Sequence, residues 1–120
     1  MKLYSYWRSS ASYRVRICLN LKGLDWDSEA IHLVQDGGQQ HSEGFLEINP
    51  SGLVPAFVDG DIILNQSLAI MEYLQEKFPE PSLLPSNIGE RAKVRALCYD
   101  IACEASPLNN LRVRQYLTNE

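Results

Sequence analysis

The chain has 120 residues, of which 45% are hydrophobic and 22% charged, the composition of an ordinary globular domain with a core. Its net charge of −4 argues against nucleic acid as the main partner, because phosphate binding needs a concentrated basic face. No apolar run approaches the roughly 18–20 residues of a membrane span, and the N-terminus lacks the apolar core of a secretion signal. The cysteines show no CxxC or His-linked metal spacing, so we expect reduced thiols, no metal and a cytoplasmic location.

The beginning of the chain predicts a strand, a helix and a second strand. Residues 2–6 are rich in aromatic side chains, which favours a strand. Apolar side chains at helical spacing over 13–22 predict a helix that starts after Ser12, a good N-cap residue, and ends at Gly23. The alternating pattern of residues 26–33 predicts the second strand.

A polar segment follows the second predicted strand. Residues 34–43 are rich in Gly and Gln and predict a loop, which leads to one short helical turn around Phe45. His32 is expected on the surface of the preceding strand and His41 in the loop. Neither histidine has a partner at catalytic spacing.

The middle of the chain predicts a hairpin and a helix. After a turn at 49–52, strands at 54–58 and 62–64 flank an Asp-Gly-Asp turn at 59–61, a strong hairpin signal. Apolar residues at helical spacing then follow Ser67, which predicts a third helix that begins near this serine.

The last third of the chain is proline-rich at first and then helical. Residues 78–85 carry three prolines and are not expected to form a helix. A helix is predicted over 90–105, an interruption at Pro107 and a resumption over 108–117.

This order of elements predicts a compact α/β domain over residues 1–80, a linker over 81–87 and a helical part over 88–120. About one and a half helices are too few to enclose a core of their own. The helical part therefore packs on the first domain, packs on a partner, or is the beginning of a longer domain.

Several motifs, in order along the whole chain, carry a family resemblance. SSASYRVRI at 9–17 resembles the SSCSxRVRI signature of zeta-class glutathione transferases, the maleylacetoacetate isomerases, and of the related maleylpyruvate isomerases. NPSGLVP at 49–55 and NQSLAIMEYL at 65–74 match elements that many glutathione transferases share. The further matches are LLP at 83–85 and PLNNL at 107–111.

The resemblance implies an α/β thioredoxin-like N-terminal domain, followed by the beginning of an all-α C-terminal domain that continues past Glu120 in the family. It also implies a homodimer. The chain departs from the family pattern at two places. Ala11 stands where the motif has cysteine, and Ala105-Ser106 precede Pro107 where bacterial relatives often have histidine.

The resemblance assigns the thiol of glutathione, the implied cofactor, to Ser9, with Ser10 in support. A thiol with a pKa near 8.5 needs a hydrogen bond and a positive field to ionise at neutral pH. The start of a helix supplies both, through unpaired N–H groups and the helix dipole. From the local sequence alone, these serines equally suit a plain helix cap. The SSAS stretch lacks the CxxC of the fold's redox relatives, which excludes disulfide exchange there.

Further glutathione contacts follow from the same resemblance. A cis Val54-Pro55 bond turns the backbone of Val54 toward the cysteinyl group, although Pro55 also suits a strand edge. Gln66 and Ser67 hold the γ-glutamyl carboxylate at a helix start, unless Ser67 is an ordinary cap. Gln40 matches a family position near the glycyl end of glutathione, or it is an ordinary residue of a solvent-exposed loop. The remaining assigned cofactor contact is Asn110.

A maleyl diacid carries two carboxylates, for which guanidinium groups are natural partners. Arg8, beside the expected thiolate, is the first candidate and Arg112 the second. Arg14 and Arg16 are the other arginines in this part of the chain. At least one of them is expected to lie along the helix surface or to form a structural pair instead of binding substrate.

The resemblance implies a glutathione-dependent isomerase of tyrosine and phenylalanine catabolism. It converts maleylacetoacetate to fumarylacetoacetate by thiolate addition, bond rotation and elimination, with cationic stabilisation by Arg8. Three alternatives remain open at this point: a maleylpyruvate isomerase, a glutathione transferase or dehalogenase that acts on small halo-acids, and a non-catalytic thioredoxin-like interaction module.

Overall fold

The computed structural model describes residues 1–118. The chain divides into two compact units, Met1–Ser82 and a second that begins at Leu83, and each is described by itself. Over the part of the chain that is described, no helix is both long and apolar enough to cross a membrane.

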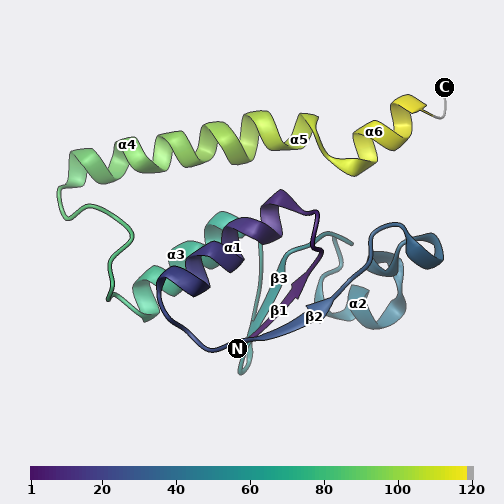
Figure 1. Cartoon of the computed structure of the whole chain (residues 1–120), viewed down its shortest axis with the longest axis horizontal. Coiled ribbons are helices and arrows are strands. Elements are labelled where there is room, and N and C mark those ends of the chain that lie inside the picture. The colour runs from purple at the N-terminus through teal and green to yellow at the C-terminus, as the bar shows by residue number, and fades with distance from the viewer. Residues whose placement is uncertain (119–120) are drawn as a thin grey trace. The chain divides into compact units, whose positions relative to one another are not determined.

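The first unit is built on a mixed sheet of four strands in the order β2-β1-β3-β4 (Figure 1). β1 (Lys2–Ser5) pairs in parallel with β2 (Asp27–Ala30) and antiparallel with β3 (Ala56–Asp59). β4 (Ile62–Asn65) completes the hairpin with β3, through a tight turn in which Gly60 takes a φ of +60°. This is the thioredoxin-like sheet that the resemblance implies.

The two faces of the sheet are covered by different helices, because side chains along a strand alternate in direction. Leu3 and Phe57 are fully buried on one face, where α1 (Ser10–Leu21) and α3 (Ser67–Lys77) lie side by side. On the other face Tyr4 packs against Phe45 of α2 (Glu43–Ile48), with ring centroids 5.9 Å apart. The buried apolar side chains of α1 and α3 that fill the first face are Val15, Leu19, Ile70 and Leu74.

α1 begins at Ser10, three residues earlier than the predicted start at Tyr13. Ser9 rather than Ser12 is the N-cap, and the Ser9 Oγ accepts the Ser12 N–H at 3.1 Å. Each of the serines of SSAS suits a cap, so the spacing alone did not decide among them. The end of the helix is as predicted, with Gly23 at a φ of +62° just beyond it.

β2 is shorter than the predicted strand over 26–33. The Ile31 N–H still donates to the Ser5 carbonyl at 2.9 Å, but residue 32 turns into the loop. The loop contains two short 3-10 turns, η1 (Gln35–Gly37) and η2 (Gln39–His41). α2 then confirms the short helix predicted around Phe45.

The second unit is helical throughout its described part. α4 (Ile88–Tyr99) continues through a π-helical segment, η3 (Asp100–Ala105), into α5 (Ser106–Leu108), and α6 (Leu111–Thr118) follows. The predicted interruption at Pro107 is wrong in position: the helical path continues across this proline, which follows directly on the π-helical segment η3. The break comes at residues 109–110.

Candidate functional site

The start of α1 presents a hydroxyl and unpaired amides at one point. The Ser9 Oγ uses a lone pair to accept the Ser12 N–H, so its own proton remains available to donate. Ser10 and Ala11 are the first two helical residues, and their N–H groups have no acceptor within the helix. Ser9 is half-buried and Ser10 exposed. This turn is therefore equipped to hold an anionic sulfur or oxygen.

Arg16 fixes the segment that leads into α1. Its guanidinium donates to the Ser5 Oγ at 3.0 Å and to the Trp7 carbonyl at 3.2 Å. The same group lies over the Tyr13 ring, 5.3 Å from its centroid. Arg16 thus forms structural contacts, as the sequence predicts for at least one of Arg14 and Arg16.

The start of α3 is a second place where amides lack helical acceptors. Gln66 occupies the N-cap position at a φ of +66°, without a side-chain hydrogen bond to the helix. Ser67 is only 5% exposed, and its Oγ accepts a hydrogen bond from the Arg14 Nε at 3.1 Å. The reading of Ser67 as an ordinary cap is therefore wrong, since its side chain contacts α1 instead.

The Val54–Pro55 peptide bond is cis and directly precedes β3. Asn49, 2% exposed, holds the preceding loop: its Nδ2 donates to the Leu53 carbonyl at 2.7 Å. Its Oδ1 accepts from the Asn65 Nδ2 at 3.2 Å, which ties this loop to the residue before Gln66. The sequence marks Asn49 only as part of a turn, and its wider role follows from its burial and its hydrogen bonds in the structure.

Gln40 lies in η2 with its Nε2 3.4 Å from the Leu33 carbonyl and 3.1 Å from the His41 Nε2. Its Oε1 is buried without a partner among the described residues. The φ of Gly38 is +97°, a conformation that residues with a side chain rarely adopt. Gly38 thus helps to shape the loop that carries Gln40, a role that the sequence did not single out.

His32 is not on a strand surface, because β2 ends before it. Its Nδ1 accepts the Gln35 N–H at 2.9 Å, and its own N–H donates to the Gln39 Oε1 at 2.8 Å. The Gln39 N–H returns a bond to the His32 carbonyl at 2.8 Å. His32 therefore anchors the loop that carries Gln40.

The arginines predicted to meet substrate are less constrained. Arg8 is exposed, and its guanidinium lies 5.6 Å from the centre of the Trp7 ring. In the second unit, the Asn110 Oδ1 accepts the Arg112 N–H at 3.1 Å, and the Arg112 side chain is exposed.

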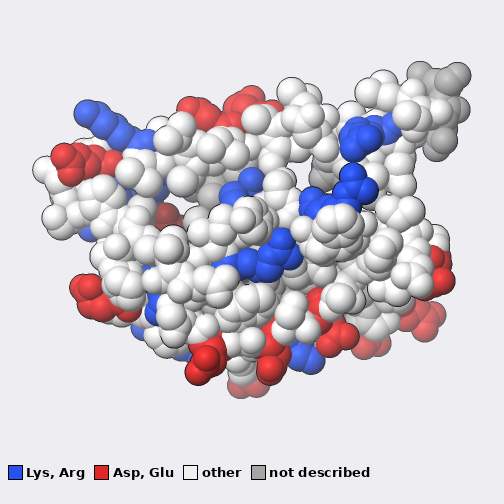
Figure 2. Space-filling model, in the orientation of Figure 1, with Lys and Arg blue, Asp and Glu red and all other residues white. Residues whose placement is uncertain are grey.

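Side-chain hydrogen bonds connect some of the segments that carry predicted site residues in the first unit. The contact of Arg14 with Ser67 connects α1 to α3, and Asn49 connects the loop before Val54 to the segment before Gln66. Both basic and acidic side chains are exposed on the face seen in Figure 2.

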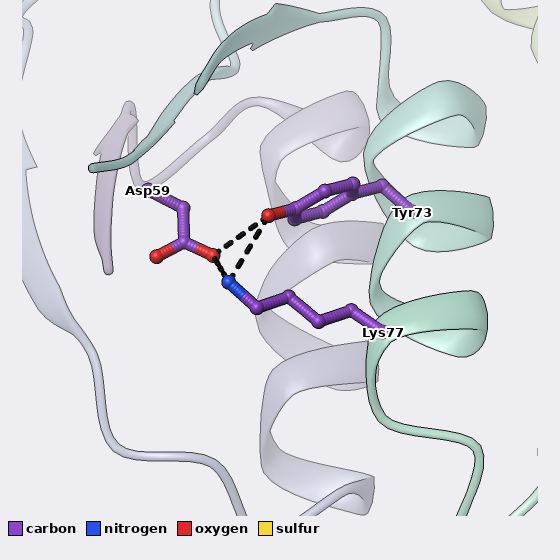
Figure 3. A network of polar contacts seen from close by, with 3 residues as sticks. All are labelled: Asp59, Tyr73 and Lys77. Carbon is purple, nitrogen blue, oxygen red and sulfur yellow. Dashed lines mark hydrogen bonds and ion pairs between the residues drawn. The ribbon is translucent and has the colours of Figure 1, made fainter. Parts of the chain in front are cut away.

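A separate polar cluster lies where the hairpin meets α3 (Figure 3). The Asp59 Oδ2 accepts hydrogen bonds from the Tyr73 hydroxyl, at 2.9 Å, and from the Lys77 ammonium. The bond from Lys77, with help from Tyr73, lowers the pKa of Asp59, and the same contacts raise the pKa of Lys77. Elsewhere, burial raises the pKa of the Cys18 thiol, which makes it a poor nucleophile.

Comparisons with known proteins place this arrangement in a family. Residues 3–82 match the family model described as the N-terminal domain of glutathione S-transferase. A probable maleylacetoacetate isomerase of Vibrio cholerae is 56% identical over 116 residues, which cover 97% of this chain and 54% of that protein.

Two solved structures are similar over nearly the whole chain. A maleyl pyruvate isomerase, a bacterial zeta-class glutathione S-transferase, aligns with a TM-score of 0.92 at 44% identity, over 98% of this chain and 54% of that one. The maleylacetoacetate isomerase of Methylobacterium extorquens AM1, solved with malonate and GSH, aligns with a TM-score of 0.93 at 47% identity, over 99% and 55%. The chain thus spans about half the length of the relatives it matches. It belongs to the zeta-class glutathione transferase family.

Proposed function

We propose that the chain binds glutathione and serves the glutathione-dependent cis–trans isomerisation of maleylacetoacetate to fumarylacetoacetate. The observation that carries the proposal is the start of α1, where the Ser9 hydroxyl keeps a free proton beside the unpaired amides of Ser10 and Ala11. The names of the similar proteins support the choice of reaction.

The residues present fit glutathione along its length. Its thiol suits the first turn of α1, and its γ-glutamyl carboxylate suits the amides at the start of α3, beside Gln66 and Ser67. The backbone of Val54, turned by the cis bond, suits the cysteinyl group. The buried Gln40 Oε1 has no protein partner among the described residues, so an N–H of the ligand's glycyl end would satisfy it.

When bound, glutathione would supply the thiolate nucleophile for reversible addition to the cis double bond. Ser9 donates its hydroxyl proton in a hydrogen bond to the sulfur, and Ser10 lies beside it in support. The positive end of the α1 dipole favours the ionised sulfur further. Arg8, next to this turn and exposed, binds a substrate carboxylate and stabilises the negative charge that develops there. Arg112 is the proposed second carboxylate partner and Asn110 an added glutathione contact.

Maleylpyruvate is a second candidate substrate, because a maleyl pyruvate isomerase of the zeta class is among the similar structures. A transferase or dehalogenase reaction on small halo-acids differs in that it consumes glutathione. Product analysis separates the two kinds of reaction, since the isomerase leaves total glutathione unchanged over many turnovers.

We also propose a homodimer in the cytoplasm. The described part of the second unit leaves large apolar side chains exposed, among them Ile88 at 83% and Leu97 at 62%. Faces of this kind mark interfaces more often than free surface. Light scattering after size exclusion measures the oligomeric state.

Thermal unfolding with and without glutathione tests the binding proposal. Glutathione at 100 times its dissociation constant stabilises a protein that binds it by about 2.7 kcal/mol, through mass action alone. We expect a raised melting temperature in millimolar glutathione and no shift with the same concentration of glycine. No shift of the melting temperature at saturating glutathione would overturn the binding proposal and favour the non-catalytic interaction module.

A further inference from the structure

The Arg14 side chain reaches from α1 to the first residue of α3. Its Nε donates to the Ser67 Oγ at 3.1 Å, although the two residues are 53 positions apart in the sequence. We infer that Arg14 is a positioning residue for the γ-glutamyl end of glutathione, acting through the Ser67 hydroxyl. The inference rests on the glutathione site proposed above.

The contact determines what Ser67 is able to do. A hydroxyl has one proton to donate and lone pairs to accept with. The charged Nε–H of Arg14 occupies the acceptor side of Ser67, so the hydroxyl proton is left to donate to an incoming carboxylate. Donation from a guanidinium also polarises the hydroxyl and strengthens it as a donor. Since Ser67 is only 5% exposed, its rotamer is held by this contact rather than by water.

The position of Arg14 also couples the two ends of the ligand site. Arg14 lies four residues after Ser10, on the same helix as the proposed thiol contacts. α1 and α3 lie side by side (Figure 1). The Arg14–Ser67 bond joins them at the first residue of α3. The bond therefore helps to set the spacing between the thiol end and the carboxylate end. Lysine lacks the fixed, planar Nε–H of arginine and does not reproduce this geometry.

Arg16 provides the matched contrast on the same helix. Its bonds go to Ser5, Tyr6 and Trp7, in the segment before α1, and none of its described bonds reaches α3. A general loss of packing from α1 should appear in variants of both arginines. A specific effect on the γ-glutamyl end should appear only in variants of Arg14.

The test compares two ligands, glutathione and cysteinylglycine, which lacks the γ-glutamyl group. Dissociation constants are measured by NMR titration for wild type, Arg14→Gln, Arg14→Lys and Arg16→Gln, after thermal unfolding has confirmed that each variant is folded. We expect Arg14→Gln to weaken glutathione binding by about tenfold, the worth of a hydrogen bond that involves a charged group. Cysteinylglycine binding should be unchanged. Arg14→Lys should lose most of the same discrimination, whereas Arg16→Gln should preserve it.

A double variant shows whether the effect passes through Ser67. In a Ser67→Ala background, Arg14→Gln should cause no further loss of glutathione affinity, because coupled residues give non-additive changes. Additive losses would overturn the inference, as would an equal loss for both ligands in Arg14→Gln or wild-type discrimination in Arg14→Lys. If wild type binds no glutathione at all, the proposed function itself fails, and the inference fails with it.

Discussion

The Ser9 side chain at the start of α1 serves the fold and the ligand with different parts of one hydroxyl group. Its oxygen accepts the Ser12 N–H and so caps the helix, while its proton remains to stabilise an anion. Capping and thiol activation are therefore compatible roles of one residue. Because the motif cysteine is Ala11 here, the hydroxyl and the helix field act without a neighbouring sulfur.

Replacing Ser9 by alanine should change stability and thiol ionisation together. Loss of the cap costs about 1 kcal/mol of stability. Loss of the hydroxyl raises the pKa of the bound glutathione thiol, since a hydrogen bond to the charged form is removed. The ultraviolet absorbance of the thiolate, followed against pH in the complex, measures the second effect.

Ser42→Ala is the matched control for Ser9→Ala. Ser42 caps α2 in the same way, with its Oγ accepting the Phe45 N–H at 3.4 Å. This variant should lose stability and leave the pKa of the bound thiol unchanged. An equal rise of that pKa in both variants would contradict the role given to Ser9.

At the scale of elements, side chains rather than backbone bonds join the hairpin and the helices. Asp59 at the end of β3 meets Tyr73 and Lys77, one turn apart on α3 (Figure 3). At the C-terminal end of α1, the buried Lys22 ammonium donates to the Phe78 carbonyl at 2.7 Å and the Pro81 carbonyl at 3.0 Å. From the sequence, Asp59 is predicted only as part of the hairpin turn, and no contact of these residues is predicted.

The Asp59 cluster predicts a defined pH dependence of stability. Because the pKa of Asp59 is lowered in the folded state, its contribution is present above the ordinary carboxyl pKa of about 4 and is lost as pH falls through the folded value. The pKa of Lys77 is raised, so the lysine contribution is present below about pH 10 and is lost as pH rises through the folded value. Asp59→Asn should therefore destabilise at neutral pH and differ less from wild type in acid.

Urea unfolding midpoints between acid and neutral pH measure this dependence. The exposed Lys2–Glu29 pair, at 3.5 Å, offers a control of the same charge type. Glu29→Gln should have a smaller effect on stability, because both side chains of the pair are about half exposed and solvent screens their attraction. A constant difference between wild type and Asp59→Asn down to the lowest pH would contradict the assignment.

At the scale of the whole molecule, motifs and local patterns predicted most of the first unit. Turn glycines, alternating strands and the hairpin signal are encoded within a few residues, as Gly23 and Gly60 illustrate. The contacts that organise the site are not local. The bonds of Arg14 to Ser67 and of Asn49 to Asn65 depend on the packing of distant elements, so spacing gives no sign of them.

The two units differ in how they are stabilised. The fully and nearly buried apolar side chains of the described residues all lie between Leu3 and Leu74, in the first unit. In the described part of the second unit no helix carries a buried residue. A unit with its own core is expected to fold independently of its neighbour.

A chain that ends at Ser82 should therefore fold and still bind glutathione, because Ser9, Gln40, Val54 and Ser67 all lie within it. Its affinity should fall only by the contribution of Asn110, about fivefold for one neutral hydrogen bond. Asn110→Ala in the 120-residue chain should cause the same fall, measured by the same titration. If the shorter chain folds but loses far more affinity than Asn110→Ala does, the second unit contributes more to the site than this asparagine. Loss of the fold itself would show that the core of the first unit is insufficient alone.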